Sequence, residues 1–337
     1  MEAAPEVSVI LPVCRAAGNV AGALDSVFSQ TFSALEVIVV NDGSPDTPAL
    51  DAALSPFATR IRYLQLAVNR GAAVARNTGI AAARGRYIAF LDADHRWSPA
   101  FLQRQVQYLD ANPGCQLVCA DCTARAARAL VRNALAAPTR DTYRVPAGQE
   151  LTAEAVTLFG LVQQRGTVVL STVVVRREAI VTAGVFDEGL RRGQDFDLWL
   201  RLALRGAQMV HQPYVLAERV VRGEPPADEA VSELERTLSV LERFARRHLL
   251  DARTRTALRI RTMQLIDRLE IEQGKLRILE GNFAAAEYHL AATRERPFKL
   301  RLAIVALRIA PHLVRAIYVR GRSALWGNAQ TAAASSR

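Results

Sequence analysis

Two aspartates directly follow an apolar run and could together bind a metal ion. Asp92 and Asp94 come after Tyr87–Leu91, a run that predicts a buried strand. Two carboxylates at the end of such a strand can reach into a single crevice. Their hard oxygen atoms suit Mg²⁺ or Mn²⁺, ions that typically bridge to diphosphate oxygens. The alternative is a solvated loop with two acids, and the spacing alone does not decide between them.

A second acidic pair, Asp195 and Asp197, lies at the start of a predicted helix over 195–205. The helix macrodipole stabilises carboxylates there and often explains them fully. Asp195 could instead act as a general base, whereas Asp197 fits a structural cap or an ion-pair partner. Arg76, on a predicted helix over 72–83, could neutralise a phosphate or could be an ordinary surface arginine.

The cysteines and histidines are weaker candidates. Cys115, Cys119 and Cys122 overlap a predicted strand and have no fourth ligand nearby, so we expect buried free thiols. His95 and His211 have no evident ligand partner in the sequence. The turn Pro12–Asn19 contains one glycine, and no Walker-type loop occurs, which argues against an NAD enzyme or a P-loop NTPase.

The elements that must position these residues predict an α/β fold with a Rossmann-like, mostly parallel sheet flanked by helices. Continuous β-branched runs alternate with helical patterns, as in sheets covered on both faces. The predicted strands cover 7–11, 35–40, 61–66 and 87–91. Such sheets bind ligands at the carboxyl ends of their strands, and Asp42, Asp92 and Asp94 fall at two such ends.

The later part of the chain is less regular and then wholly helical. We expect a strand over 171–175, a short helix over 177–183 and a linker at Gly223–Ala227. Gly281-Asn282-Phe283 and the residues after it resemble one tetratricopeptide-type hairpin without a repeating period. The predicted parts are an α/β domain over 1–225, a helical extension over 226–330 and a disordered tail over 331–337.

Composition excludes other classes of protein. Half of the 337 residues are hydrophobic and 23% are charged, so the chain is not wholly disordered. No run of 18 or more uninterrupted apolar residues occurs, which argues against a membrane-spanning helix. Because the N-terminus has no secretory leader and the chain has four cysteines, we expect reduced thiols and a cytoplasmic protein.

The net charge of +10 is concentrated in the C-terminal part. Residues 251–337 hold 16 basic and 7 acidic residues, yet no nucleic-acid-binding module accompanies them, so we expect no nucleic-acid partner. Within 298–326, arginines recur every seven residues: Arg301, Arg308, Arg315 and Arg322. Two alternatives stay open for this segment. It forms helices that pack on the catalytic domain, or it makes peripheral contact with the inner face of a membrane.

Taken in order, the motifs resemble those of the family 2 glycosyltransferases, inverting enzymes with the glycosyltransferase A fold. The match runs from Val7 to about Gly206. It is carried by segments 7–13, 25–32, 36–44, 69–79, 85–94, 184–188 and 193–202. The resemblance implies a nucleotide-binding half over about 1–97 and an acceptor half over about 98–225.

The resemblance also implies the reaction and the roles of the residues. A sugar would pass from a nucleotide-sugar donor, UDP-linked, to a hydroxyl of a glycan or lipid-linked acceptor in cell-surface polysaccharide synthesis. Asp195 would be the catalytic base, and Asp94 would hold Mn²⁺ or Mg²⁺. The residues that would bind the nucleotide-sugar are Pro12, Asp42, Arg76, Asp92 and Asp94, with Asp42 at the base and Asp92 at the ribose or sugar.

The sequence departs from the family pattern in four places. Cys14-Arg15 stands in place of Tyr-Asn, His95 in place of a third aspartate and Gln194 in place of a glutamate, and the Arg-x-His element is absent around 218–222. A catalytically degenerate glycan-binding or assembly subunit is therefore one alternative, although Asp94 and Asp195 are retained. A sugar nucleotidyltransferase is the other, but its glycine-rich, lysine-containing loop is missing.

Overall fold

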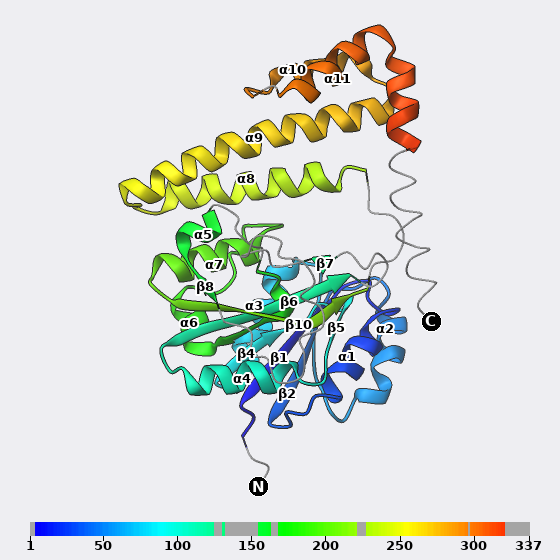
Figure 1. Ribbon diagram of the computed structural model, residues 1–337. Coiled ribbons are helices and arrows are strands. Elements are labelled where there is room, and N and C mark those ends of the chain that lie inside the picture. Colours follow the sequence, from blue (N-terminus) through cyan, green and yellow to red (C-terminus); the bar gives the residue numbers. More distant parts are fainter. Residues whose placement is uncertain are drawn as a thin grey trace. The chain divides into compact units, whose positions relative to one another are not determined.

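The computed structural model describes residues 4–124, 130–131, 154–162, 168–220, 227–295 and 297–320. These residues form two compact units (Figure 1). The first unit contains a sheet with its flanking helices and includes the described residues up to 220. The second unit is helical and includes the described residues from 227 onward.

A mixed, mostly parallel sheet forms the centre of the first unit. Its strands follow the order β3-β2-β1-β4-β9-β6-β10-β5, with β7 beside β6 and β8 beside β10. The strands are β1 (Val7–Val13), β2 (Leu35–Asp42), β3 (Arg62–Leu66), β4 (Tyr87–Phe90), β5 (His95–Trp97), β6 (Cys115–Ala124), β7 (Leu130–Val131), β8 (Glu154–Val156), β9 (Val173–Arg176) and β10 (Gln208–Arg219). Strands β3, β2, β1 and β4 are parallel, whereas β9 is antiparallel to β4 and β6. The predicted fold class is confirmed.

Helices cover both faces of this sheet. They are α1 (Val20–Phe28), α2 (Thr47–Leu54), α3 (Ala72–Ala82), α4 (Phe101–Ala111), α5 (Leu158–Val162), α6 (Arg177–Thr182) and α7 (Gln194–Leu204). On one face Val9 and Leu11 of β1 belong to a buried cluster with residues of α1, α2 and α4. On the other face Ile10 lies so close to α3 that a Cβ on Gly79 would be 2.5 Å from its Cγ2. Strand β1 is thus buried on both sides, which explains its continuous apolar run.

Strands β9 and β10 differ from the sequence prediction. The strand predicted over 171–175 is wrong in its first half, because Leu170–Thr172 form a 3₁₀ turn and β9 begins only at Val173. Strand β10, 12 residues long, was not predicted. Buried His211 and Gln212 interrupt its apolar pattern, and its register with β6 shifts at several positions. Pairing with β6, which lies about 90 residues earlier, holds this polar segment in the sheet.

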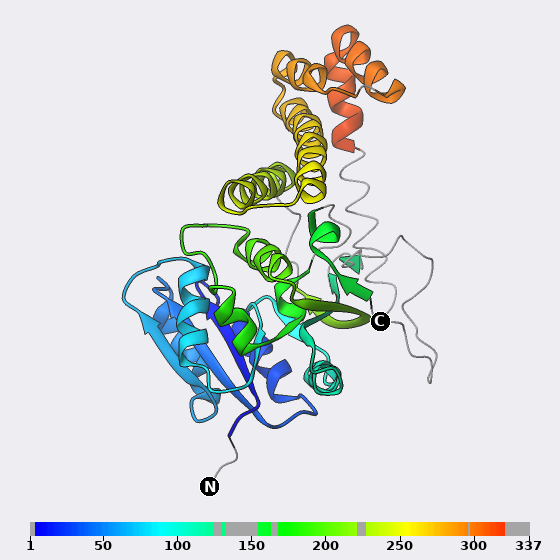
Figure 2. The same cartoon turned by 90° about the vertical axis from the view of Figure 1, so that its left-hand side faces the viewer.

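The second unit consists of packed helices (Figure 2). These are α8 (Glu229–Arg247), α9 (Ala252–Glu280), α10 (Phe283–Ala292) and α11 (Phe298–Ile309), and residues 311–320 are also helical. The Asp251 side chain accepts a hydrogen bond from the Thr254 amide and so begins α9, which ends at Gly281 in the left-handed conformation (φ 82°). None of the described helices is long and apolar enough to span a bilayer.

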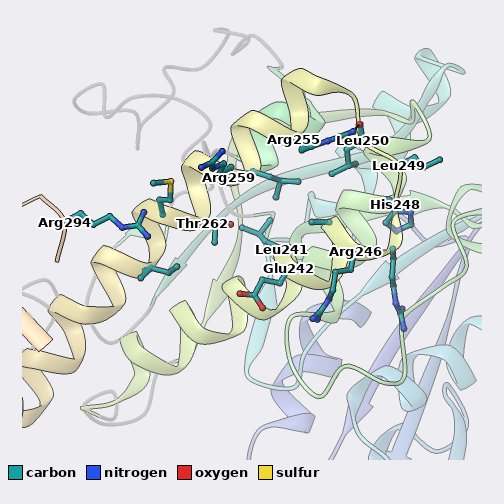
Figure 3. A pocket seen from close by; sticks show the side chains of 15 residues that line it. Leu241, Glu242, Arg246, His248, Leu249, Leu250, Arg255, Arg259, Thr262 and Arg294 are labelled. Carbon is teal, nitrogen blue, oxygen red and sulfur yellow. Dashed lines mark hydrogen bonds between the residues drawn. The ribbon is translucent and has the colours of Figure 1, made fainter. Parts of the chain in front are cut away.

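A cavity of about 820 Å³ lies within the helical unit, lined by residues of α8, α9 and the loop between them together with Arg294. Figure 3 shows Leu241 and Leu250 among its apolar walls and Arg246, Arg255 and Arg259 among its basic ones. Three predicted segments lie wholly or partly outside the described residues. These are residues 223–226 of the linker predicted over Gly223–Ala227, the disordered tail predicted over 331–337, and the part of 298–326 beyond residue 320.

Candidate active site

The last residue of β2, Asp42, binds the backbone just before α3. Buried Asp42 accepts hydrogen bonds from the backbone amides of Arg70 and Gly71, both at 2.8 Å. Gly43, which follows it, has a φ of 56°, and a Cβ there would lie 2.4 Å from the Asn69 backbone nitrogen. The loop before α3 therefore packs directly on the turn after β2. Asp42 anchors this loop, and its contact with a nucleotide base stays a prediction.

The end of β4 carries an ion pair that faces α3. Asp92 Oδ1 lies 2.8 Å from Arg76 Nη2, and Arg76 is buried although it is charged. Its guanidinium also lies 5.6 Å from the centre of the Phe186 ring. Among the described residues, nothing accepts a hydrogen bond from Arg76 Nε. Because a buried guanidinium with an unused donor is costly, this arginine can bind a further acceptor, such as a phosphate oxygen.

Asp195 belongs to the same electrostatic cluster although it is 103 residues from Asp92. It lies in the first turn of α7, after Gly193 in the left-handed conformation (φ 74°). Burial raises the pKa of Asp195. The charge of Asp92 adds to this effect, while the charge of Arg76 and the backbone amide of Phe196 oppose it. A carboxylate with a raised pKa is a stronger base than an ordinary aspartate, as general-base catalysis requires.

Asp197, two residues further along α7, has a structural partner instead. Its Oδ2 accepts a hydrogen bond from Arg201 Nε at 2.8 Å, and both side chains are largely buried. Arg201 also donates to the carbonyl oxygens of Ala183 and Val185, at 2.5 and 2.6 Å. The next residue, Phe186, is the one that contacts Arg76. The Asp197–Arg201 pair therefore holds the segment that lies beside the cluster.

Asp94 is surrounded by positive charge. Its Oδ1 lies 2.8 Å from His95 Nδ1 and its Oδ2 lies 3.3 Å from Arg219 Nε. Burial would raise the pKa of Asp94, but the hydrogen bond from His95 and the charge of Arg219 lower it. For His95 burial opposes the charged form, yet the bond to Asp94 and the nearby acidic groups raise its pKa to about 9. Asp94 is thus a carboxylate held by two cations.

This arrangement limits the kind of metal site that the chain can form. Among the described residues, no group of three or more His, Cys, Asp or Glu side chains could enclose a metal ion. One aspartate, about one third exposed, can still supply a single hard oxygen ligand. Mg²⁺ and Mn²⁺ are commonly held by one or two carboxylates together with substrate phosphates. The residues therefore fit an ion shared with a bound diphosphate, and not an ion that the protein encloses alone.

The remaining candidates lie as follows. Pro12 is in β1, paired with Val40, and is partly exposed near the end of the strand. Cys115, Cys119 and Cys122 are buried free thiols along β6, as predicted. His211 lies 3.0 Å from Asp121 within the sheet, and both are buried.

Sequence reasoning missed the contribution of residues far along the chain. Arg219 lies at the end of β10, and the amide of Val220 donates to the Asp94 carbonyl oxygen at 2.7 Å. Ser171 accepts a hydrogen bond from the Asp92 amide at 3.1 Å and its carbonyl accepts one from Trp97 Nε1. No local motif marks Arg219 or Ser171. Phe186, in contrast, lies within segment 184–188, one of the segments that carry the family resemblance, and this was the signal that the sequence offered.

Comparison with known sequences relates part of the chain to one family. Residues 8–132 match Glycosyl transferase family 2. The Succinoglycan biosynthesis protein ExoO of Rhizobium meliloti is 42% identical over 108 residues, which are 32% of this chain and 30% of that protein. The putative teichuronic acid biosynthesis glycosyltransferase TuaG of Bacillus subtilis is 38% identical over 106 residues, 31% of this chain and 42% of that protein. The first curated relatives are matched over less than a third of their length.

Solved structures share the fold. The mannosyltransferase PcManGT of Pyrobaculum calidifontis, in complex with GDP-Man and Mn²⁺, aligns with a TM-score of 0.60 at 19% identity over 98% of this chain and 88% of that one. S. aureus TarS in complex with UDP-GlcNAc aligns with a TM-score of 0.59 at 18% identity over 94% and 92% of the two chains. Residues 8–132 thus match glycosyltransferase family 2, and the likeness to these solved structures shows that the chain has the glycosyltransferase A fold.

Proposed function

We propose that the chain is an inverting glycosyltransferase that moves a sugar from a UDP-linked donor to a hydroxyl of a glycan or lipid-linked acceptor in cell-surface polysaccharide synthesis. The observation that carries the proposal is the placement of Asp195 beside the Arg76–Asp92 pair, with a raised pKa. A base and a cation with an unused donor thus lie together at the end of β4. Inverting transfer needs this combination and needs no covalent nucleophile.

The proposed mechanism is a single displacement at the anomeric carbon. Asp195 accepts the proton of the acceptor hydroxyl while the hydroxyl oxygen attacks the anomeric carbon. The raised pKa of the Asp195 carboxyl makes it a stronger proton acceptor than an ordinary aspartate. Arg76 donates from its unused Nε to the donor diphosphate, while Asp92 holds the guanidinium in place and meets the ribose or sugar. Pro12 and Asp42, at the ends of β1 and β2, would border the nucleotide.

A divalent cation is part of the proposal, with Asp94 as its one protein ligand. When bound, Mn²⁺ or Mg²⁺ would neutralise charge that develops on the leaving diphosphate. The mannosyltransferase that shares the fold was solved with Mn²⁺, which supports this choice of ion. His95 and Arg219 hold the Asp94 carboxylate and so fix its direction.

The relatives support the choice of donor and pathway. TarS was solved with UDP and with UDP-GlcNAc. ExoO is named for succinoglycan biosynthesis and TuaG for teichuronic acid biosynthesis. Both names concern polysaccharides of the cell surface, and on this basis we assign the chain to the same class of pathway.

The test is a thermal-shift panel of the full chain with UDP-, GDP-, dTDP- and CMP-sugars, with and without Mn²⁺, followed by an assay of UDP release on added acceptors. A ligand at 100 times its dissociation constant stabilises a protein by ~2.7 kcal/mol. This corresponds to about 5–11 °C for a unit of this size, at about 2–4 °C per kcal/mol. We expect this shift with a UDP-sugar, and we expect it to grow with Mn²⁺.

The Asp94→Asn variant tests the metal ligand, with Asp25→Asn as its control because Asp25 is an exposed aspartate on α1. Asp94→Asn should lose the Mn²⁺-dependent part of the shift and should lose transfer, whereas the control should keep both. Equal Mn²⁺ dependence in both variants would show that Asp94 is not a metal ligand. Donor binding without any transfer or hydrolysis would favour the glycan-binding or assembly subunit instead.

A further inference from the structure

One face of α11 packs inside the helical unit. Ile304 and Leu307 are buried in a cluster with Ile278 of α9 and with Ala286 and Leu290 of α10. From the next helix, Val314 and Tyr318 pack against the same cluster. Burial of this inward face explains why the 298–320 segment folds. The packing involves only one side of α11.

The opposite face of α11 is apolar as well, yet it is exposed. Phe298, Leu302, Val305 and Ile309 have exposed fractions of 78%, 58%, 47% and 78%. At 100° per residue, their spacing of four, three and four places them within an arc of about 60° on the side away from Ile304 and Leu307. On helix 311–320, Leu313 and Ile317 are exposed by 60% and 63% and lie one turn apart. We call these six side chains the outer stripe.

Basic residues border the outer stripe. Lys299 lies on one side of it along α11, and Arg301 and Arg308 lie on the other. Residues 297–320 contain five basic residues and no acidic one. Arg301 and Arg308 line a cavity of about 660 Å³ together with Arg294 and with Val305 of the stripe. An apolar stripe flanked by cations is the pattern of helices that lie in the headgroup region of a membrane.

We propose that α11 and helix 311–320 rest on an anionic membrane surface, with the outer stripe in the boundary between headgroups and acyl chains. The arginines beside the stripe would meet lipid phosphates, and the cavity between α10 and α11 would receive a headgroup. This contact is peripheral, because no described helix can span the bilayer. The proposal does not depend on glycosyl transfer, and its test measures no activity.

Charge argues for a membrane rather than a second copy of the chain. In a two-fold dimer the same patch faces itself, so the stripes would meet only if the basic borders also approached each other. Arg308 has Glu287 as a partner at 2.7 Å, but the 297–320 segment supplies no acid of its own to pair with a copy. An anionic membrane offers acyl chains to the apolar side chains and phosphates to the basic ones.

The test is co-sedimentation of the full chain with vesicles of phosphatidylcholine alone and with phosphatidylglycerol added, at low and high salt. The variant Leu302→Glu/Ile309→Glu changes the stripe without touching the buried cluster. The control Ile260→Glu/Met263→Glu changes two exposed apolar residues of α9. Far-UV circular dichroism and melting temperature confirm that each variant is folded.

We expect wild type and control to bind anionic vesicles, with binding that weakens in high salt. The stripe variant should bind at least about a hundredfold more weakly. The two replacements remove apolar side chains from the boundary and place acidic groups there, and a hundredfold loss corresponds to about 2.8 kcal/mol. Equal binding by the stripe and control variants would overturn the proposal. Equal binding of wild type to vesicles with and without phosphatidylglycerol would overturn it as well. Dimerisation of wild type that the stripe variant abolishes, with no vesicle binding, would assign the face to a second copy.

Discussion

Replacing Asp197 with asparagine should destabilise the first unit strongly, whereas the same replacement at Asp195 should not. The two aspartates lie in the first turn of α7 and differ by two positions. Their surroundings differ in kind, because Asp197 is paired with Arg201 and Asp195 has a pKa raised by burial. The pair of variants therefore separates a structural carboxylate from a proposed catalytic one.

The effect at Asp197 follows from its ion pair. The two side chains are only 5% and 13% exposed, and their closest atoms are 2.8 Å apart. Asparagine would leave the Arg201 guanidinium buried without its counter-charge, and breaking a buried pair costs about 3–5 kcal/mol. For a unit of this size we expect the melting temperature to fall by about 6–20 °C. Donor affinity should weaken as well, because Arg201 holds the segment that leads to Phe186.

The effect at Asp195 has the opposite sign for stability. A raised pKa means that the folded state binds the proton more tightly than the unfolded chain does, so the ionised carboxylate destabilises the fold above its folded-state pKa. Replacing Asp195 with the neutral asparagine should therefore leave the melting temperature unchanged or raise it wherever the wild-type carboxylate is ionised. Turnover should fall by at least about a hundredfold, since general-base catalysis is worth about 10²–10⁴.

Differential scanning calorimetry and a UDP-release assay on the same preparations measure both effects. The wild-type turnover should also decline on the acid side at a higher pH than an ordinary aspartate would give, because protonation of Asp195 removes the base. Equal losses of melting temperature in the two variants would refute the structural reasoning. Retention of more than a tenth of wild-type turnover by Asp195→Asn would refute the catalytic assignment.

Two further variants test how the sheet and its loop are held. Glu36 is buried, and although burial would raise its pKa, hydrogen bonds from Ser8, Arg84 and Arg62 lower it. Glu36→Gln should therefore cost about 2 kcal/mol above pH 4.5 and progressively less as the pH falls below it, as urea unfolding at several pH values would show; a cost that is independent of pH would contradict this. Gly43→Ala would place a Cβ 2.4 Å from the Asn69 nitrogen and should weaken both stability and UDP-sugar affinity, measured by calorimetry. Gly206→Ala is the matched control, because Gly206 also has a positive φ (77°) but nothing lies within 4 Å of the new Cβ. Similar losses of affinity in both variants would argue against a role for the packing of Gly43 on the loop before α3.

The sequence by itself determined the parallel half of the sheet and the strand ends that carry the acids. Strands β1, β2, β3 and β4 were predicted to within two residues at each end. Strands β1, β2 and β4 are mostly apolar runs, and in β3 apolar residues are mixed with Arg62 and Gln65. It also placed Asp42, Asp92 and Asp94 after such strands, and Asp195 at a helix start. These features depend on local periodicity and turn chemistry, which a single sequence displays.

Only the tertiary structure decided which of these residues meet. Asp94 pairs with Arg219 across 125 positions, and Asn77 binds the Phe186 backbone across 109. Strand β10, with its polar residues and shifted register, exists through its pairing with β6. In the helical unit, α11 packs one face against α9 and α10 and leaves the other face exposed. Such contacts depend on how distant segments pack, and no spacing within either segment records the choice of partner.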